Sequence, residues 1–107
     1  MNKKIRQKRD RILDEMREID RLRQGTLSEQ YYGIGDNRQG PYYVLQGYDD
    51  GRHWSKRIPR DQVDKVKEDI GAGVQLNKLC RDFAGLTEEA TIAQDNIESK
   101  KNSGKQR

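Results

Sequence analysis

Aromatic and basic side chains gather in one part of this chain. Six of the seven aromatic residues lie between positions 31 and 54, and five Lys or Arg residues lie among or just after them. Cations neutralise phosphates, and aromatic faces stack on bases or pack against sugars. The combination predicts a nucleic-acid contact, most simply with duplex DNA, whose major groove admits a β-ribbon. The residues predicted to make this contact are Arg38, Tyr42, Tyr48, Arg52, Lys56, Arg57 and Arg60.

The rings have a second interpretation, because aromatic side chains also dominate the cores of small sheets. This interpretation favours Tyr31, Tyr43 and Trp54 as core residues. It does not account for Arg52, Lys56 and Arg57, which have no apolar role. The basic side chains are therefore the stronger indication of a polyanionic partner.

Catalytic and metal chemistry find little support in the residue types. His53 is the only histidine and Cys80 the only cysteine, and the pattern places them on different elements. We expect Cys80 to be a small buried or half-buried residue, and His53 to lie on a strand face opposite Tyr48. A zinc site needs four ligands of the Cys or His type, which the chain lacks. We expect no enzymatic activity, no cofactor and no metal.

A β-hairpin is the element that must position these side chains. Asp50-Gly51 is a strong signal for a two-residue type I′ turn, which needs positive φ at both central positions. This turn pairs Tyr48 with His53, Gly47 with Trp54, Leu45 with Lys56 and Tyr43 with Ile58. One face then carries Tyr43, Leu45, Trp54 and Ile58, with Trp54 over Gly47. The other carries Val44, Gln46, Tyr48, His53, Ser55 and Arg57.

Two segments lie before the hairpin in the chain. Ile5, Ile12, Leu13, Met16, Ile19 and Leu22 recur at helical spacing, which predicts a helix from about Lys3 to Gln24 that stops at Gly25. Alternation over Thr26–Tyr32 then indicates a short strand. The glycine-rich segment Gly33–Gly40 is predicted to be a loop without a nucleotide-binding motif.

A long helix is predicted after Pro59. Val63, Val66, Ile70 and Val74 follow helical spacing, and a heptad continues from Leu76 to Ile97. Gly71-Ala72-Gly73 lies between the two phases and predicts a phase shift or kink. The heptad pairs either with the N-terminal helix of the same chain, our first choice, or with its copy in a homodimer. The residues predicted to form this partner or oligomer surface are Leu76, Leu79, Phe83, Leu86 and Ala90.

The predicted architecture is α+β: an N-terminal helix, a small two- or three-stranded antiparallel sheet, and a long C-terminal helix with coiled-coil heptads. Residues 1–98 form one domain of this kind, and the basic segment 99–107 is a disordered tail. The 107 residues carry a net charge of +4, with nine Lys or Arg against five Asp or Glu in residues 1–25. No apolar run is long enough for a signal peptide or a membrane span, which predicts a cytoplasmic protein.

Several segments together resemble a known family. Gly25-Thr26-Leu27-Ser28-Glu29-Gln30-Tyr31, Gly40-Pro41-Tyr42-Tyr43-Val44-Leu45 and Arg57-Ile58-Pro59 are similar to a family of small bacterial proteins. Its members are often encoded beside transposases and other mobile-element genes. Relatives commonly carry cysteines before the Gly-Pro-Tyr-Tyr box, but this chain has none between Gly33 and Gln39, so no metal function is implied here.

Two functions are therefore predicted. The first is a non-enzymatic nucleic-acid-binding or accessory module of a mobile genetic element, with the basic hairpin on the phosphate backbone. The second is a protein-interaction module or inhibitor, which docks on a larger mobile-element protein through the heptad helix and the aromatic sheet.

Overall fold

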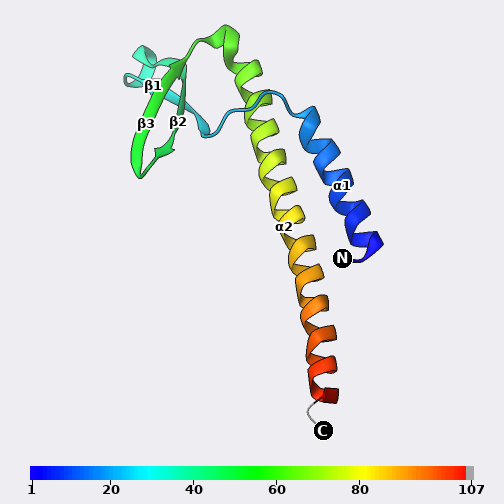
Figure 1. Cartoon of the computed structure of the whole chain (residues 1–107). Helices are drawn as coiled ribbons and strands as arrows, with labels where there is room; N and C mark the ends of the chain where they lie inside the picture. Colours follow the sequence, from blue (N-terminus) through cyan, green and yellow to red (C-terminus); the bar gives the residue numbers. More distant parts are fainter. Residues whose placement is uncertain (106–107) are drawn as a thin grey trace. The chain divides into compact units, whose positions relative to one another are not determined.

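The fold is α+β, as predicted, with one helix before and one after a three-stranded antiparallel sheet (Figure 1). The computed structural model describes the backbone of residues 1–105 and the side chains of residues 1–100. The strand order is β1-β2-β3, so both hairpin strands and the preceding strand belong to one sheet. The elements are α1 (Lys3–Glu18), β1 (Thr26–Tyr32), β2 (Gln39–Asp49), β3 (Arg52–Ile58) and α2 (Val63–Lys105), with short 3-10 turns at Gly35–Asn37 and Arg60–Gln62.

Two compact units divide the chain, and α2 contributes to both. The sheet unit is Arg21–Val74, which contains the three strands and the first turns of α2. The helical unit contains Met1–Asp20 and α2 from Gln75 onward. The tail predicted at 99–107 falls partly on α2, which is helical through Lys105, and partly outside the described residues.

The hairpin has the predicted turn and the predicted register. Asp50 has φ 49° and Gly51 has φ 78°, the positive values that a type I′ turn requires. Tyr48 pairs with His53, and the register continues without a shift to Tyr43 and Ile58. Because side chains alternate along a strand, this register decides which side chains share a face.

The inner face of the sheet carries the core of the sheet unit. Leu45 and Ile58 are buried with Val63 and Val66 from the first turns of α2, and Val66 is only 1% exposed. Leu27, Tyr43, Trp54 and Ile70 pack against this cluster. A Cβ on Gly47 would lie 2.8 Å from Trp54 Cζ2, so the indole covers Gly47 as the register predicted. The predicted inward residues are therefore confirmed.

The predicted end of the N-terminal helix was wrong. α1 ends at Glu18 rather than near Gln24, and Ile19 caps it with an extended backbone and a bond from its N–H to the Met16 carbonyl. Gly25 is not a helix stop. It has φ 125°, and a Cβ there would lie 2.8 Å from the Gln46 carbonyl oxygen, so Gly25 lets the chain pass close to β2.

Asp69 of α2 explains why the chain is not helical just before β1. Its carboxylate, 4% exposed, accepts hydrogen bonds from Arg21 Nε at 2.8 Å and Arg23 Nε at 3.0 Å. The Arg23 backbone N–H also donates to the Asp69 carbonyl oxygen at 2.9 Å. We call these three bonds the Asp69 clamp. Tertiary bonds of this kind replace the helical bonds that local periodicity had predicted for this segment.

The long helix predicted after Pro59 is confirmed: α2 is one helix from Val63 to Lys105, and it continues through Gly71-Ala72-Gly73. Val74 continues the helical spacing of Val63, Val66 and Ile70 but is 63% exposed, whereas Gly73 is buried. A Cβ on Gly73 would lie 2.7 Å from the Arg23 carbonyl oxygen. Gly73 is therefore the position where the segment held by the Asp69 clamp passes closest to α2.

Within the helical unit, α1 lies beside α2 and runs antiparallel to it (Figure 1). Ile5 and Leu79 are buried, and the Arg9 guanidinium lies 4.5 Å from the centre of the Phe83 ring. Leu76, Phe83, Leu86 and Ala90 are half-buried, while Ala93 and Ile97 are exposed. The first part of the heptad therefore pairs within the chain.

We predict that Asp69→Asn destabilises the protein at neutral pH and reduces its sensitivity to acid. The hydrogen bond from Arg21 is the main cause that lowers the pKa of Asp69 below 3.8; the bond from Arg23 and both positive charges add to it, and burial opposes it. Since the folded pKa is the lower one, the stability it contributes is complete above the unfolded value and is lost as pH falls through the folded value.

Chemical denaturation of wild type, Asp69→Asn and the exposed control Glu68→Gln, from neutral pH to below pH 3.8, measures this contribution. Asp69→Asn should have a lower free energy of unfolding than wild type at neutral pH. The difference in free energy of unfolding between the two proteins should become smaller in acid. An Asp69→Asn protein as stable as Glu68→Gln would contradict the role of the clamp.

We predict opposite effects for alanine at two glycines of α2. Gly71→Ala should stabilise the protein by about 1 kcal/mol, because an exposed helical glycine is replaced and no atom lies within 4 Å of the new Cβ. Gly73→Ala should destabilise it by about 1–3 kcal/mol, because the Cβ overlaps the Arg23 carbonyl oxygen. The unfolding temperatures of the two variants test this prediction. Equal shifts in unfolding temperature for both variants would contradict the close approach of Gly73 to the Arg23 carbonyl oxygen.

Candidate nucleic-acid interface

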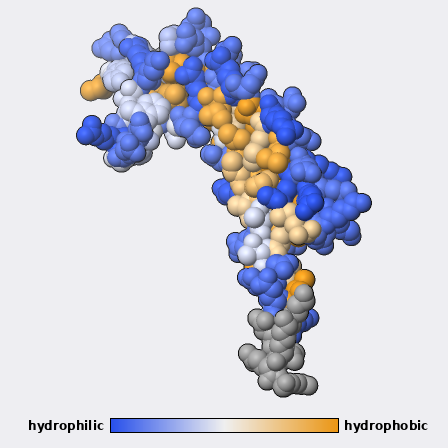
Figure 2. Space-filling view, viewed as in Figure 1, coloured by the Kyte–Doolittle hydropathy of each residue, from blue (hydrophilic) through white to orange (hydrophobic). Residues whose placement is uncertain are grey.

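The second face of the sheet is polar and aromatic and carries none of the core residues. Figure 2 shows mostly hydrophilic residues and residues of intermediate hydropathy over the strands. Strand alternation and the observed registers define its members. We call this surface the outer face; it consists of Thr26, Ser28, Gln30, Tyr32, Tyr42, Val44, Gln46, Tyr48, His53, Ser55 and Arg57.

Three side chains from three strands form a cluster at one end of the outer face. The Arg57 guanidinium lies 4.0 Å from the centre of the Tyr42 ring, and the Tyr32 ring lies 5.2 Å from that of Tyr42. A register shift between Gln30 and Tyr32 accompanies this arrangement, since the extra residue of a bulge re-aims the side chains that follow it. Tyr32 is 55% exposed, so much of its ring is open to a ligand.

Hydrogen bonds connect the strands across the middle of the outer face. Gln46 Nε2 donates to Ser28 Oγ at 3.4 Å, and Gln46 Oε1 lies 3.3 Å from His53 Nε2. The His53 ring contacts Tyr48 edge-on with centroids 5.4 Å apart. Tyr48 is 76% exposed, the second large ring of this face that is open to solvent. The predicted pairing of His53 with Tyr48 is confirmed. The adjacent Gln46 side chain is held between Ser28 and His53.

The charge on the outer face has one sign. Among its eleven residues, Arg57 is the only formally charged side chain, and none is a carboxylate. Glu29 and Asp49 pair with Tyr43 and Arg52, so the alternation directs both acids to the inner face. An anion that approaches the outer face therefore meets a cation and no acidic residue of that face.

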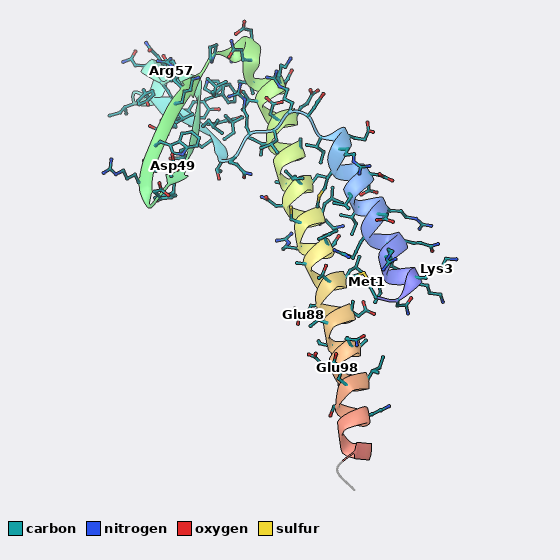
Figure 3. All side chains as sticks on the ribbon, viewed as in Figure 1. Met1, Lys3, Asp49, Arg57, Glu88 and Glu98 are labelled. Carbon is teal, nitrogen blue, oxygen red and sulfur yellow. The ribbon has the colours of Figure 1, made fainter. Side chains whose placement is uncertain are left out.

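The predicted contact residues do not share one face. Tyr42, Tyr48 and Arg57 belong to the outer face, whereas Arg52 and Lys56 follow the alternation of the inner face. Arg38 lies over the Tyr31 ring at 4.0 Å, and Tyr31 donates a hydrogen bond to Glu29, an inner-face residue. Figure 3 labels Arg57 and Asp49, which lie at opposite ends of the hairpin.

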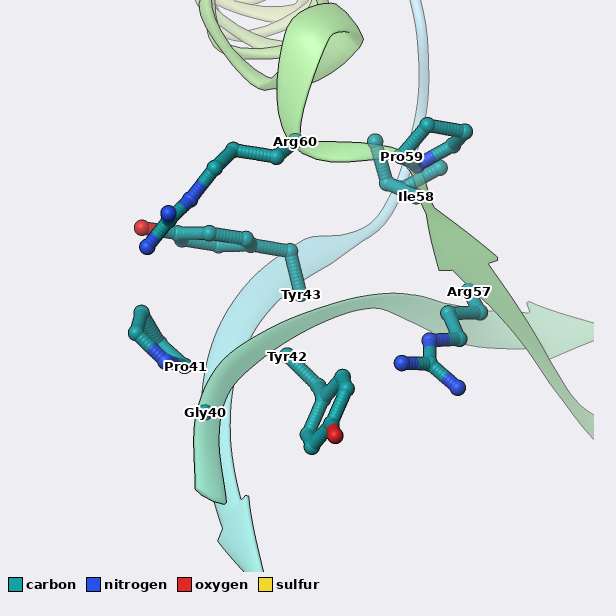
Figure 4. Close-up of a pocket in the computed structure, with 8 residues that line it drawn as sticks. All are labelled: Gly40, Pro41, Tyr42, Tyr43, Arg57, Ile58, Pro59 and Arg60. Carbon is teal, nitrogen blue, oxygen red and sulfur yellow. The ribbon is translucent and has the colours of Figure 1, made fainter.

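Arg60 lies at a pocket close to the cluster. This pocket has a volume of about 330 Å³ and is formed by Gly40–Tyr43 and Arg57–Arg60. Figure 4 shows the Arg60 side chain beside the Tyr43 ring, and Arg57 on the other side with Tyr42. The pocket therefore has an arginine and a tyrosine on each side.

Part of this surface could not be found from sequence. Tyr32 was counted among the aromatic residues but not assigned to the site, because the bulge that brings it to Tyr42 has no clear sequence signal. Gln46 and Ser28 were not assigned either, since their contact depends on the register between β1 and β2. The hairpin signal covers only β2 and β3.

The other chemistry-bearing residues lie outside this surface. Cys80 is exposed on α2, so its predicted burial was wrong. No group of three or more His, Cys, Asp or Glu side chains is arranged for a metal ion in the part of the chain that the structure describes. Among the same residues, no helix combines the length and apolarity needed to cross a membrane.

Comparisons with known proteins identified no relative: no family model, no curated protein and no solved structure matches this chain. The resemblance to the mobile-element family therefore stays a prediction, and any function has to be argued from the surface itself.

Proposed function

We propose that this protein is a nucleic-acid-binding module that uses the outer face of its sheet. The observation that carries the proposal is the cluster of Arg57, Tyr42 and Tyr32, in which a cation and two rings lie together on a face without carboxylates. Nucleic acids present phosphates and planar bases at short regular intervals, and these side chains complement both.

Each side chain of the cluster has a separate role in this proposal. Arg57 contacts a phosphate, while its position over the Tyr42 ring limits the conformational freedom that binding would otherwise cost. Tyr32 and Tyr48 offer their exposed rings for stacking. Arg60 provides a second cation at the pocket beside the cluster. Binding of this kind requires no catalytic group.

The accessory role in a mobile genetic element and the cytoplasmic location stay predictions. The first rests on the resemblance alone and the second on the sequence. Docking on a larger protein through the heptad is also still a prediction. Leu79 is buried and Phe83 is in contact with Arg9, so substitution of either residue would test the packing of the helical unit as well as docking.

We predict that Arg57→Gln weakens nucleic-acid binding by about tenfold to a hundredfold, because a charge-assisted hydrogen bond contributes about 1.5–3 kcal/mol. Lys56→Gln is the matched control: it removes the same charge from the adjacent residue of β3, and it lies on the inner face. Fluorescence anisotropy with labelled oligonucleotides at roughly 50 mM salt measures both variants.

The slope of log K against log salt separates a specific loss from a general one. Arg57→Gln should reduce the slope by about 0.7–0.9, the value for one phosphate contact. Lys56→Gln should have the smaller effect on affinity. Equal losses in the two variants would show that net charge, rather than the outer face, determines binding, and absence of binding in the wild type would exclude the function.

A further inference from the structure

A hollow lies at each end of the outer face, and the one at the arginine end is also lined by the inner-face residues Tyr43 and Ile58. One is the arginine pocket formed by Gly40–Tyr43 and Arg57–Arg60. The other, of about 370 Å³, is lined by Gly25, Thr26, Gln46, Gly47, Tyr48 and His53, next to the hairpin turn. Tyr42 and Tyr48 mark the two ends and are six residues apart on β2, which corresponds to about 20 Å of strand. A ligand that fills both hollows has to be extended.

The hollow beside the turn has the groups that recognise a base edge. Gln46 uses one amide N–H toward Ser28, and its oxygen lies next to His53. A primary amide has two N–H donors and two lone pairs, so one donor and one lone pair remain for a ligand. Tyr48, exposed at the side of this hollow, supplies a ring on which a base can stack.

A duplex does not fit this distribution of groups. The bases of a duplex are stacked on one another, so their faces are closed to Tyr32, Tyr42 and Tyr48. Affinity for a duplex comes mainly from many phosphate contacts, and Arg57 is the only cation of the outer face, with Arg60 at the adjacent pocket. A single strand exposes its base faces and needs fewer phosphate contacts.

We propose that the ligand of the outer face is single-stranded nucleic acid, DNA or RNA, that lies along β2 between the two hollows. One base stacks on Tyr48 and meets the Gln46 amide, and another stacks at Tyr32 and Tyr42. Arg57 contacts a phosphate on the outer face, and Arg60 contacts a phosphate where the strand leaves that face through the arginine pocket. This inference rests on the proposed function and narrows its substrate from nucleic acid in general to single strands.

The test compares three labelled probes of about 12 nucleotides, within the usual range of single-strand site sizes: a single-stranded DNA, the RNA of the same sequence, and the DNA duplex. Anisotropy titrations of the full chain from roughly 50 to 200 mM salt should show at least one single strand bound about tenfold or more tighter than the duplex. The salt slope should be near −1.4, about 0.7 for each of two phosphates. Comparison of the DNA and RNA arms identifies the preferred backbone.

Two tyrosine variants test the stacking without disturbing the core. Tyr48→Leu should weaken single-strand binding by about fivefold to a hundredfold, since loss of one stacking contact costs about 1–3 kcal/mol. Tyr31→Leu is the control, because Tyr31 is also exposed but lies with Glu29 and Arg38 away from the outer face. Its affinity should stay close to that of the wild type. Thermal unfolding of both variants verifies that each is folded.

The outcomes separate this inference from the function on which it rests. Tighter binding of the duplex, or equal losses in Tyr48→Leu and Tyr31→Leu, would overturn the single-strand inference and leave nucleic-acid binding in place. Failure of all three probes to bind at the lowest salt would overturn both.

Discussion

The Asp69 clamp is the interaction on which the sheet unit depends most. A buried carboxylate needs compensating partners, and that of Asp69 obtains two guanidiniums from the segment that leads into β1. The main-chain carbonyl oxygen of Asp69 also accepts a hydrogen bond from the Arg23 N–H. The same α2 turns supply Val63 and Val66 to the core beneath the sheet. One helix therefore covers the inner face and fixes the entry of the first strand, which leaves the outer face open.

The properties of the outer face follow from strand alternation. Each residue that packs into the core directs its neighbours outward, so the buried Leu45 and Ile58 determine that Val44, Gln46 and Arg57 point away from it. Two close approaches through glycine support this arrangement. Gly47 makes room for the Trp54 ring, and Gly25 lets the chain pass the Gln46 carbonyl. The chain thereby combines a small core with an exposed aromatic and polar surface.

Local signals predicted the hairpin well and the tertiary contacts poorly. The Asp50-Gly51 turn determines its own register, and that register determines the inward residues, so sequence was sufficient for this part. The end of α1 could not be predicted, because Asp69 lies far along the chain from Arg21 and Arg23. For the same reason the close approach of Gly73 to Arg23 had no signal in the sequence, where Gly71-Ala72-Gly73 predicted a phase shift or kink. The cluster of Tyr32, Tyr42 and Arg57 depends on a bulge and a three-strand register, which leave no local pattern.

The most direct measurement of the central claim is a titration of the ¹⁵N-labelled protein with single-stranded oligonucleotide, followed by amide chemical shifts. Binding to the outer face predicts the largest changes at Tyr32, Tyr42, Gln46, Tyr48, His53 and Arg57, with small changes on α1. Changes concentrated on α1 or on the exposed part of α2, with the outer face unaffected, would contradict the claim that this surface is the binding site.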